Sequence, residues 1–304
     1  MASQDRTVRQ TIKEITRRHL GEGHRCFGQC LTAVGWVGGT LPELYEEDGM
    51  VELSMADVAG GGIVTGLALA GERPIYVVRY QGFQWYNSPM IVNYAMKSKE
   101  IWQRPCPLFV RSIAMEGGMG PVAGSSHHSL YHRMPGCKII SPMTPREYEL
   151  AYDSFMGEDD VYYVSEHRGS YDNTQELANI VYDDADFTLF PISITRFAAL
   201  EAQKQLAEMG YKVNVCHILW IKPLGVDDYQ LAAAKASKFG GMVLDDDYVE
   251  GTASSIAHTI MLKTGKPIYA CGLEPRTAGF HPKVDNLPPS KDRIVKRVLE
   301  LVNV

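Results

Sequence analysis

The chain has 304 residues, of which 45% are hydrophobic and 22% are charged, and its formal net charge is −6. This composition is typical of a globular protein, and the length suits two α/β domains better than one core. We find no apolar run near the ~20 residues that a membrane-spanning helix needs and no apolar signal core at the N-terminus, so we expect a cytoplasmic protein. The acidic balance, without a basic stripe, argues against nucleic acid as the main partner.

Apolar runs and helical periodicity alternate along the first half of the chain. The predicted strands are residues 24–31, 50–55, 74–80, 107–113, 138–141 and 161–164, with a glycine-rich loop at residues 35–39. The predicted helices are residues 7–20, 59–70 and 87–102 and one that starts near Pro145. Strand and helix alternation of this kind predicts a parallel sheet.

The second half repeats this alternation after a connector at residues 167–186, where apolar periodicity is lost. The predicted strands are residues 187–192, 213–218 and 241–244, and the predicted helices are residues 195–209, 227–239 and 254–262. A second, smaller parallel sheet is therefore expected, and we place the domain boundary at residue 180.

Glycines crowd one predicted helix, residues 59–70, at positions 60, 61, 62 and 66. Each glycine costs a helix interior roughly 1 kcal/mol relative to alanine. So many of them imply a compensating close approach, either to a second helix or to a ligand.

Residues 52–74, ELSMADVAGGGIVTGLALAGERP, resemble a segment of the beta subunit of the first component of 2-oxoacid dehydrogenases and of transketolase-like thiamine diphosphate enzymes. The matches are Gly62, Gly66, Ala68, Gly71, Arg73 and Pro74. Residues 135–149, 221–228, 244–260 and 286–301 also resemble the family. The resemblance implies an α/β chain with a pyrimidine-binding domain at residues 1–180 and a transketolase C-terminal-like domain at residues 181–304, each a mainly parallel sheet flanked by helices.

In that family an acidic residue hydrogen-bonds the aminopyrimidine ring of thiamine diphosphate, and Asp57 stands at the matching position. The family residue is a glutamate. The shorter aspartate implies either a closer backbone, aided by the glycines, or a weaker activation of the cofactor. The residue type alone allows another interpretation, because aspartate is a favoured N-cap residue and Asp57 would then only cap a helix that starts at residue 58.

An aromatic cluster follows the predicted strand at residues 74–80. Phe83 stands where the family stacks a ring on the aminopyrimidine, and Tyr80 and Tyr86 are further candidates for cofactor binding. The alternative is that these rings belong to an ordinary core. Arg79 in the same strand would pair with an acid or with substrate.

Residues 124–136, GSSHHSLYHRMPG, form the second informative segment. The SHHSL core resembles a segment of split transketolases in which a histidine faces the thiazolium ring and the substrate. The resemblance implies His127 or His128 as a catalytic group, with His132 as a further candidate, because histidine exchanges protons near neutral pH. From the residues alone, histidines bonded to the backbone or a metal site remain open.

The acidic run, the cysteines and two glycine-rich stretches can be explained without a catalytic role. The acidic run Asp245–Asp247 follows a predicted strand and predicts a solvated loop or a subunit contact, with a divalent cation site as the alternative. The six cysteines are scattered and are expected to be reduced thiols. The glycines at residues 117–120 predict a flexible turn, and residues 35–39 lack the Lys-Ser/Thr of a phosphate-binding loop.

A motif of the family is missing from the chain. Thiamine enzymes of this group hold the diphosphate through Mg²⁺ on a G-D-G motif, and the sequence contains no G-D-G. The resemblance therefore implies that a separate alpha-type chain supplies the diphosphate and metal half, in an α₂β₂ assembly. The glycine-rich helix is a candidate for the interface.

The function implied is that of a beta-type subunit of a two-chain enzyme that depends on thiamine diphosphate. Such an enzyme cleaves or forms a C–C bond next to a carbonyl, by 2-oxoacid decarboxylation with acyl transfer or by ketol transfer. The alternative is a non-catalytic structural or regulatory paralogue. Asp57 departs from the family glutamate, and the stretch between SHHSL and MPG is shorter than in the relatives that the segment resembles. An unrelated nucleotide-binding module is disfavoured, since no phosphate-loop fingerprint follows any predicted strand.

Overall fold

The computed structural model describes residues 6–116, 124–279 and 283–303. Its internal contacts divide the chain into two compact units. The first unit contains the residues up to Met115 together with Leu130–Glu176, and the second contains Glu116–Ser129 and the residues from Leu177 onward. The glycine turn predicted at residues 117–120 lies outside the described residues.

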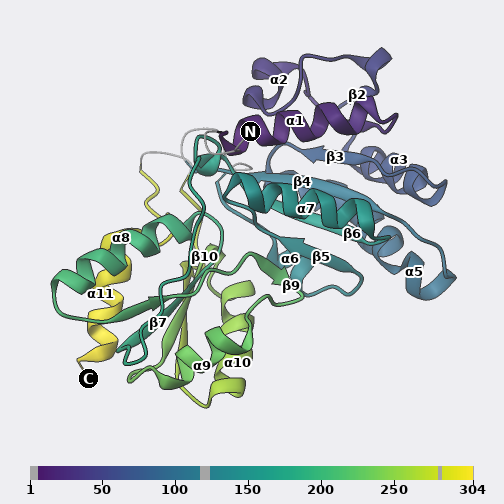
Figure 1. The fold of residues 1–304 in the computed structure, drawn as a ribbon. Helices are drawn as coiled ribbons and strands as arrows, with labels where there is room; N and C mark the ends of the chain where they lie inside the picture. Colours follow the sequence, from purple (N-terminus) through teal and green to yellow (C-terminus); the bar gives the residue numbers. More distant parts are fainter. Residues whose placement is uncertain (1–5, 117–123, 280–282, 304) are drawn as a thin grey trace. The chain divides into compact units, whose positions relative to one another are not determined.

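Six strands of the first unit form a parallel sheet in the order β2-β1-β3-β4-β6-β5 (Figure 1). The strands are β1 (Cys26–Gln29), β2 (Met50–Leu53), β3 (Ile75–Val78), β4 (Leu108–Ala114), β5 (Cys137–Ile140) and β6 (Val161–His167). The central strands β3, β4 and β6 are buried along their whole length. Burial on both faces explains why their sequences are continuous apolar runs.

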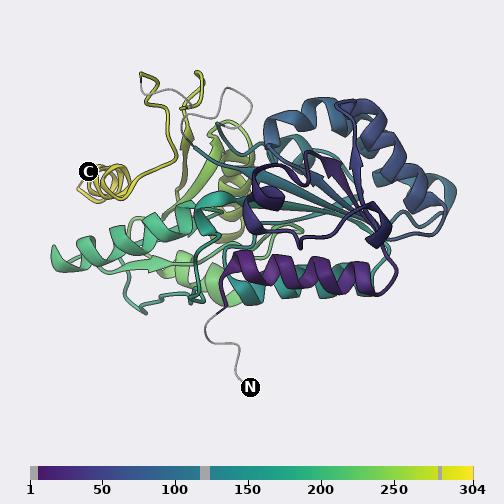
Figure 2. The same cartoon turned by 90° about the horizontal axis from the view of Figure 1, so that it is seen from above.

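Helices cover both faces of this sheet (Figure 2). On one face lie α1 (Val8–Gly21) and α7 (Pro145–Gly157), and on the other lie α3 (Asp57–Leu69), α4 (Gln84–Met90) and α5 (Met96–Trp102). A π-helical turn at Ile91–Ala95 joins α4 to α5, and the short α6 (Ser129–His132) precedes β5. Helix α1 begins where the sequence predicts, because Thr7 and Gln10 form a capping box.

The segment expected to be a glycine-rich loop is instead the short helical segment α2 (Ala33–Gly39). Its residues 34–39 all have positive φ values, from 52° to 76°. Glycine accepts this left-handed backbone readily, but Val34, Trp36 and Val37 do not. The periodicity of apolar residues predicts only right-handed helices, so it could not indicate this segment.

The second unit has its own parallel sheet, in the order β11-β10-β7-β8. The strands are β7 (Phe187–Pro191), β8 (Val213–Val215), β10 (Gly241–Tyr248) and β11 (Ile268–Leu273), and β9 (Trp220–Lys222) is a further short strand. One face carries α8 (Thr195–Glu208) and α11 (Lys291–Val302), and the other carries α9 (Asp228–Ala236) and α10 (Thr252–Thr264) (Figure 1). The fold class predicted from the sequence is confirmed, although β9, β11 and α11 were not predicted.

Two smaller predictions have clear outcomes. All six cysteines are free thiols, five of them buried, which confirms the prediction of reduced cysteines. Among the described residues, no helix combines the length and the apolar character needed to cross a bilayer.

The glycines of α3 do allow a close approach, and the partner is α4. A Cβ atom on Gly61 would lie 2.3 Å from the backbone oxygen of Asn87, and one on Gly60 would lie 2.8 Å from the hydroxyl of Tyr76. Neither position has room for a side chain. The close-packing prediction is confirmed, with a second helix as one partner.

Replacing Gly61 by alanine is therefore expected to destabilise the chain by about 1–3 kcal/mol, because α3 must move away from α4. Gly66 is the matched control on the same helix, since a Cβ atom there meets nothing within 4 Å. Gly66→Ala is expected to be neutral or to stabilise the chain by up to about 1 kcal/mol. Urea unfolding of both variants measures the difference, and equal stability of the two would contradict the packing argument.

Candidate functional site

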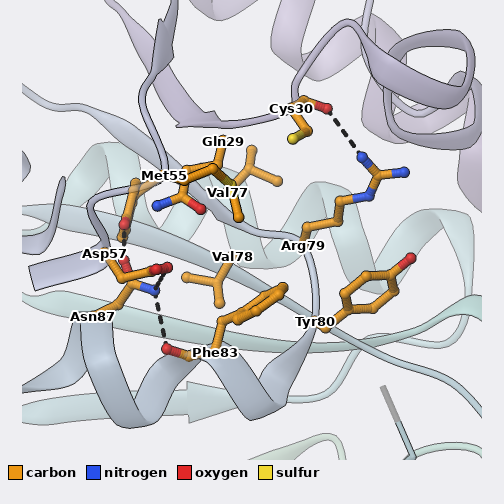
Figure 3. A pocket seen from close by; sticks show the side chains of 11 residues that line it. Gln29, Cys30, Met55, Asp57, Val77, Val78, Arg79, Tyr80, Phe83 and Asn87 are labelled. Atoms are coloured by element: carbon orange, nitrogen blue, oxygen red, sulfur yellow. Dashed lines mark hydrogen bonds between the residues drawn. The ribbon is translucent and has the colours of Figure 1, made fainter. Parts of the chain in front are cut away.

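A cavity of about 140 Å³ lies in the first unit, beside the carboxyl ends of β1 and β3 (Figure 3). Ligand sites of parallel α/β sheets form at this edge. The lining residues are Gln29, Cys30, Met55, Asp57, Tyr76, Val77, Val78, Arg79, Tyr80, Phe83 and Asn87. Most of the wall is apolar, and few polar groups reach it, as in many small-molecule sites.

Asp57 is the first residue of α3 and is half-buried. The N-cap residue is Ala56, without a side-chain cap, so the interpretation of Asp57 as the cap is wrong. Its Oδ1 atom instead accepts a 2.9 Å hydrogen bond from Nδ2 of Asn87. A carboxylate in the first turn also interacts favourably with the helix dipole. The structure thus places this carboxylate in the cavity wall.

Asn87 of α4 holds the carboxylate in place. Its Nδ2 atom also donates to the backbone oxygen of Phe83 at 3.1 Å (Figure 3). Its Oδ1 atom accepts a hydrogen bond from the hydroxyl of Tyr76. Burial, together with the charge of Asp57, raises the pKa of Tyr76, so this hydroxyl remains a donor. These bonds fix the orientation of the Asn87 amide, and the amide fixes Asp57.

The aromatic candidates divide into two groups. Phe83 and Tyr80 line the cavity, with ring centroids 5.9 Å apart and an interplanar angle of 42°. Tyr86 is 58% exposed and does not line the cavity. Arg79 donates to the backbone oxygen of Cys30 at 3.3 Å and lies over the ring of Tyr80.

Sequence analysis missed three polar residues of the cavity: Gln29, Tyr76 and Asn87. Gln29 is the last residue of β1, at the carboxyl edge of the sheet. A polar residue at this position could have been predicted to belong to the site. Its Nε2 atom is buried and has no hydrogen-bond partner among the described residues. A buried donor without a partner is costly, so a ligand with an acceptor at this position would relieve that cost.

The histidine segment belongs to the second unit, where it contacts β10. The three aspartates Asp245, Asp246 and Asp247 lie within this strand and are at most 1% exposed, so the prediction of a solvated loop is wrong. Asp245 pairs with His128 at 3.0 Å, and Asp246 accepts from the hydroxyl of Ser126 at 2.6 Å. These carboxylates therefore bind protein donors instead of water.

His127 and His128 differ in their surroundings. His128 is completely buried, whereas His127 is partly exposed and has its Nε2 atom 3.2 Å from the hydroxyl of Ser125. The ring of His127 also stacks on Tyr248, with centroids 6.3 Å apart. His132 is the last residue of α6 (Ser129–His132).

Comparison with known families matches both halves of the chain. Residues 31–174 match the model of the transketolase pyrimidine-binding domain, and residues 176–284 match the model of the transketolase C-terminal domain. Asp57 and Phe83 lie in the first match, and Asp245–Asp247 lie in the second.

Several curated proteins are similar to the chain over most of its length. It is 25% identical to the 2-oxoisovalerate dehydrogenase subunit beta of Bacillus subtilis (strain 168), over 71% of this chain and 70% of that protein. It is 23% identical to the pyruvate dehydrogenase E1 component subunit beta of Staphylococcus epidermidis (strain ATCC 12228 / FDA PCI 1200), over 76% and 78% of the two chains. A solved structure titled "Split gene transketolase, inactive beta4 tetramer" has the same fold, with a TM-score of 0.76, 14% identity and coverage of 98% of this chain and 99% of that chain.

Proposed function

Because the chain carries both domains and belongs to the transketolase-like family of 2-oxoacid dehydrogenase beta subunits, we propose that it forms half of the active site of a two-chain thiamine diphosphate enzyme. The enzyme would cleave or form a C–C bond next to a carbonyl. The observation that carries the proposal is the carboxylate of Asp57, held by Asn87 in the wall of an apolar cavity.

The residues around the cavity suit an aminopyrimidine ring. Asp57 offers an acceptor for a protonated ring nitrogen, Phe83 offers an aromatic face, and Gln29 offers a buried donor that has no partner among the described residues. A flat heteroaromatic ring gains about 1 kcal/mol from stacking beyond its burial. Thiamine diphosphate, when bound, would supply the nucleophilic carbon that attacks the substrate carbonyl.

The shorter aspartate fits this role because α3 packs so tightly. Gly60 and Gly61 let the first turns of the helix approach Tyr76 and Asn87, where any side chain would collide. The carboxylate that begins this helix therefore starts close to the strand and to α4. We propose that this approach makes up for the missing methylene.

A partner chain is proposed to hold the diphosphate and Mg²⁺. Mg²⁺ needs oxygen ligands in octahedral geometry, and the family motif that supplies them does not occur in the sequence. Large apolar residues also stand exposed on the helices next to the cavity: Val58, Ile63, Leu69, Trp85, Tyr86, Tyr94, Ile101 and Trp102. Exposed apolar residues gathered on neighbouring helices favour a protein interface. We propose an alpha-type chain as the partner, in an α₂β₂ assembly.

Reconstitution tests this function. The chain is mixed with the product of a neighbouring reading frame that encodes a G-D-G motif followed by Asn, together with thiamine diphosphate and Mg²⁺. Decarboxylation of 2-oxoacids and ketol transfer are assayed in parallel, and cofactor binding is measured by calorimetry. We expect one of the two activities from the mixture and none from the chain by itself. Absence of both turnover and cofactor binding in an assembled complex would refute the proposal.

A further inference from the structure

The side chain of Gln29 presents a buried hydrogen-bond donor to the cavity of the first unit (Figure 3). Gln29 is the last residue of β1 and pairs in register with Leu53 of β2. On its other side β1 lies so close to β3 that a Cβ atom on Gly28 would be 2.8 Å from the backbone oxygen of Val77. The Nε2 atom of Gln29 nonetheless makes no hydrogen bond to any residue that the structure describes. A buried donor without a partner costs free energy, so the fold alone does not account for a glutamine here.

Gln81 is a second buried glutamine at the same edge of the sheet and provides a comparison. It follows β3, the strand next to β1, and is 0% exposed. Its Nε2 atom donates to the backbone oxygen of Ser112 at 3.2 Å and to the hydroxyl of Ser165 at 2.9 Å, and its Oε1 atom accepts from the hydroxyl of Tyr163 at 3.1 Å. Both polar atoms of this amide thus have partners within the first unit. The contrast indicates that the amide of Gln29 has a role other than stabilising the fold.

Hydrogen bonds within the cavity wall leave one carboxylate oxygen for a ligand. Both donors of the Asn87 amide are used, on Oδ1 of Asp57 at 2.9 Å and on the backbone oxygen of Phe83 at 3.1 Å. The hydroxyl of Tyr76 donates to the same amide. These bonds leave the second carboxylate oxygen of Asp57, Oδ2, to accept from a ligand. Together with the Nε2 atom of Gln29, the wall therefore offers one acceptor and one donor.

An aminopyrimidine ring matches this pair of groups. Its protonated ring nitrogen donates to the carboxylate of Asp57, which is the role that the proposed function gives to Asp57. The exocyclic amino group of the ring is itself a donor, so it does not accept a hydrogen bond from Gln29. The second ring nitrogen carries a free lone pair and is the acceptor that remains. Every donor and acceptor in the ring plane that faces the wall then has a partner.

We propose that Gln29 is a specificity-determining residue, which donates from Nε2 to the second ring nitrogen of the ligand and thereby selects a ring with two nitrogens. The chemistry of the ring rests on the proposed function, whereas the unpaired donor is a property of this chain. A site built to hydrogen-bond its ligand discriminates against an analogue that lacks the matching group, because a buried polar group of the site then stays unpaired in the complex.

Gln29→Met tests whether the donor is unpaired in the free chain. Methionine is close to glutamine in length and volume and has no N–H group, so this variant is expected to keep or raise the urea midpoint. Gln81→Met is the matched control and is expected to lower the midpoint, because it leaves the hydroxyl of Tyr163 and the backbone oxygen of Ser112 without that partner. A fall in Gln29→Met as large as that in Gln81→Met would mean that Gln29 is bonded within the chain, and would overturn the inference.

Binding of two small rings to the isolated chain tests the acceptor. The first is 4-amino-2-methylpyrimidine, and the second is 4-amino-2-methylpyridine, which keeps the ring nitrogen opposite the amino group and lacks the other one. Gln29→Met is expected to bind the pyrimidine about 5- to 100-fold more weakly than the wild type in a nuclear magnetic resonance titration, because the second nitrogen loses its donor. Both chains are expected to bind the pyridine equally, since that ring has no acceptor for Gln29. Comparing each ring between the two chains cancels the difference in basicity between the rings.

The outcomes separate the role of Gln29 from the proposed function. Equal weakening of both rings in Gln29→Met, or of neither, would overturn that role, and so would failure of the folded wild type to bind the pyrimidine. Turnover of the reconstituted enzyme without this selectivity would keep the proposed function and reject the role of Gln29. Weaker binding of the pyrimidine alone in Gln29→Met, with no turnover of the reconstituted wild type, would support the role of Gln29 and reject the proposed C–C bond chemistry.

Discussion

Replacing Asp57 by alanine is expected to lower kcat of the reconstituted enzyme by about 10²–10⁴-fold, the range that a positioned acid–base group contributes. The carboxylate is already held by the 2.9 Å bond from Asn87, so its orientation does not depend on a ligand. Without it, a protonated ring nitrogen in the cavity has no acceptor. Measuring kcat at saturating thiamine diphosphate separates this effect from weaker cofactor binding.

Asp57→Glu is the matched control for this experiment. It keeps the carboxylate and adds one methylene, so it is expected to retain a larger share of turnover than Asp57→Ala. Both changes fall on a half-buried residue at the start of α3, and the unfolding transitions are expected to stay close to that of the wild type. Wild-type turnover in Asp57→Ala would favour the alternative of a structural or regulatory subunit.

The architecture could be predicted because its signals are local. Buried parallel strands such as β3 and β4 are continuous apolar runs, and helices such as α1 and α7 begin at a capping threonine, Thr7 or Thr144. Asp57 and Phe83 could also be found from local signals. Asp57 stands at the start of the glycine-rich helix, and Phe83 follows the next strand in the chain. The family resemblance suggested their roles, which no periodic pattern of the sequence indicates.

No local sequence feature indicated that Asn87 and Tyr76 belong to the cavity. Nothing in the sequence around Asn87 indicates that its amide reaches Asp57, thirty positions earlier. That contact depends on the absence of a side chain at Gly61, which lets α3 and α4 touch. A glycine pattern predicts that something packs closely, but only the three-dimensional structure identifies the partner.

The prediction of a solvated loop at Asp245–Asp247 was wrong, but it followed from a general rule about charged residues. Charged residues are almost never fully buried unless they are paired, and the neighbouring sequence offers them no cation. Their partners come from residues 126–129, which lie far away in the chain. Long-range pairing of this kind cannot be read from local composition.

The largest effect on stability is expected at an ion pair inside the first unit, Arg111 of β4 with Glu166 of β6. Two hydrogen bonds of 2.7 and 3.0 Å join the side chains, and each residue is 1% exposed. The hydroxyls of Tyr148 and Tyr171 donate to the same carboxylate at 2.7 and 2.8 Å, and Nη2 of Arg111 also donates to Thr40. The carboxylate is thus the centre of a buried network.

Glu166→Gln is expected to lower the free energy of unfolding by about 3–5 kcal/mol, because it leaves the guanidinium charge of Arg111 buried without a counter-ion. One guanidinium nitrogen, Nη1, already lacks a hydrogen-bond partner among the described residues, so the network has no spare acceptor there. Urea unfolding of the isolated chain measures the change.

The exposed pair Lys99–Asp160 is the matched control, since Lys99 is 58% exposed and its ion pair is 2.8 Å long. Lys99→Met is expected to cost no more than about 1 kcal/mol, because water screens surface charges. Removing both buried charges, in Arg111→Met with Glu166→Met, is expected to cost less than Glu166→Gln by itself, since no isolated charge remains. If Glu166→Gln cost no more than Lys99→Met, the buried pair would not be what holds β4 and β6 in place, and their apolar packing would be sufficient.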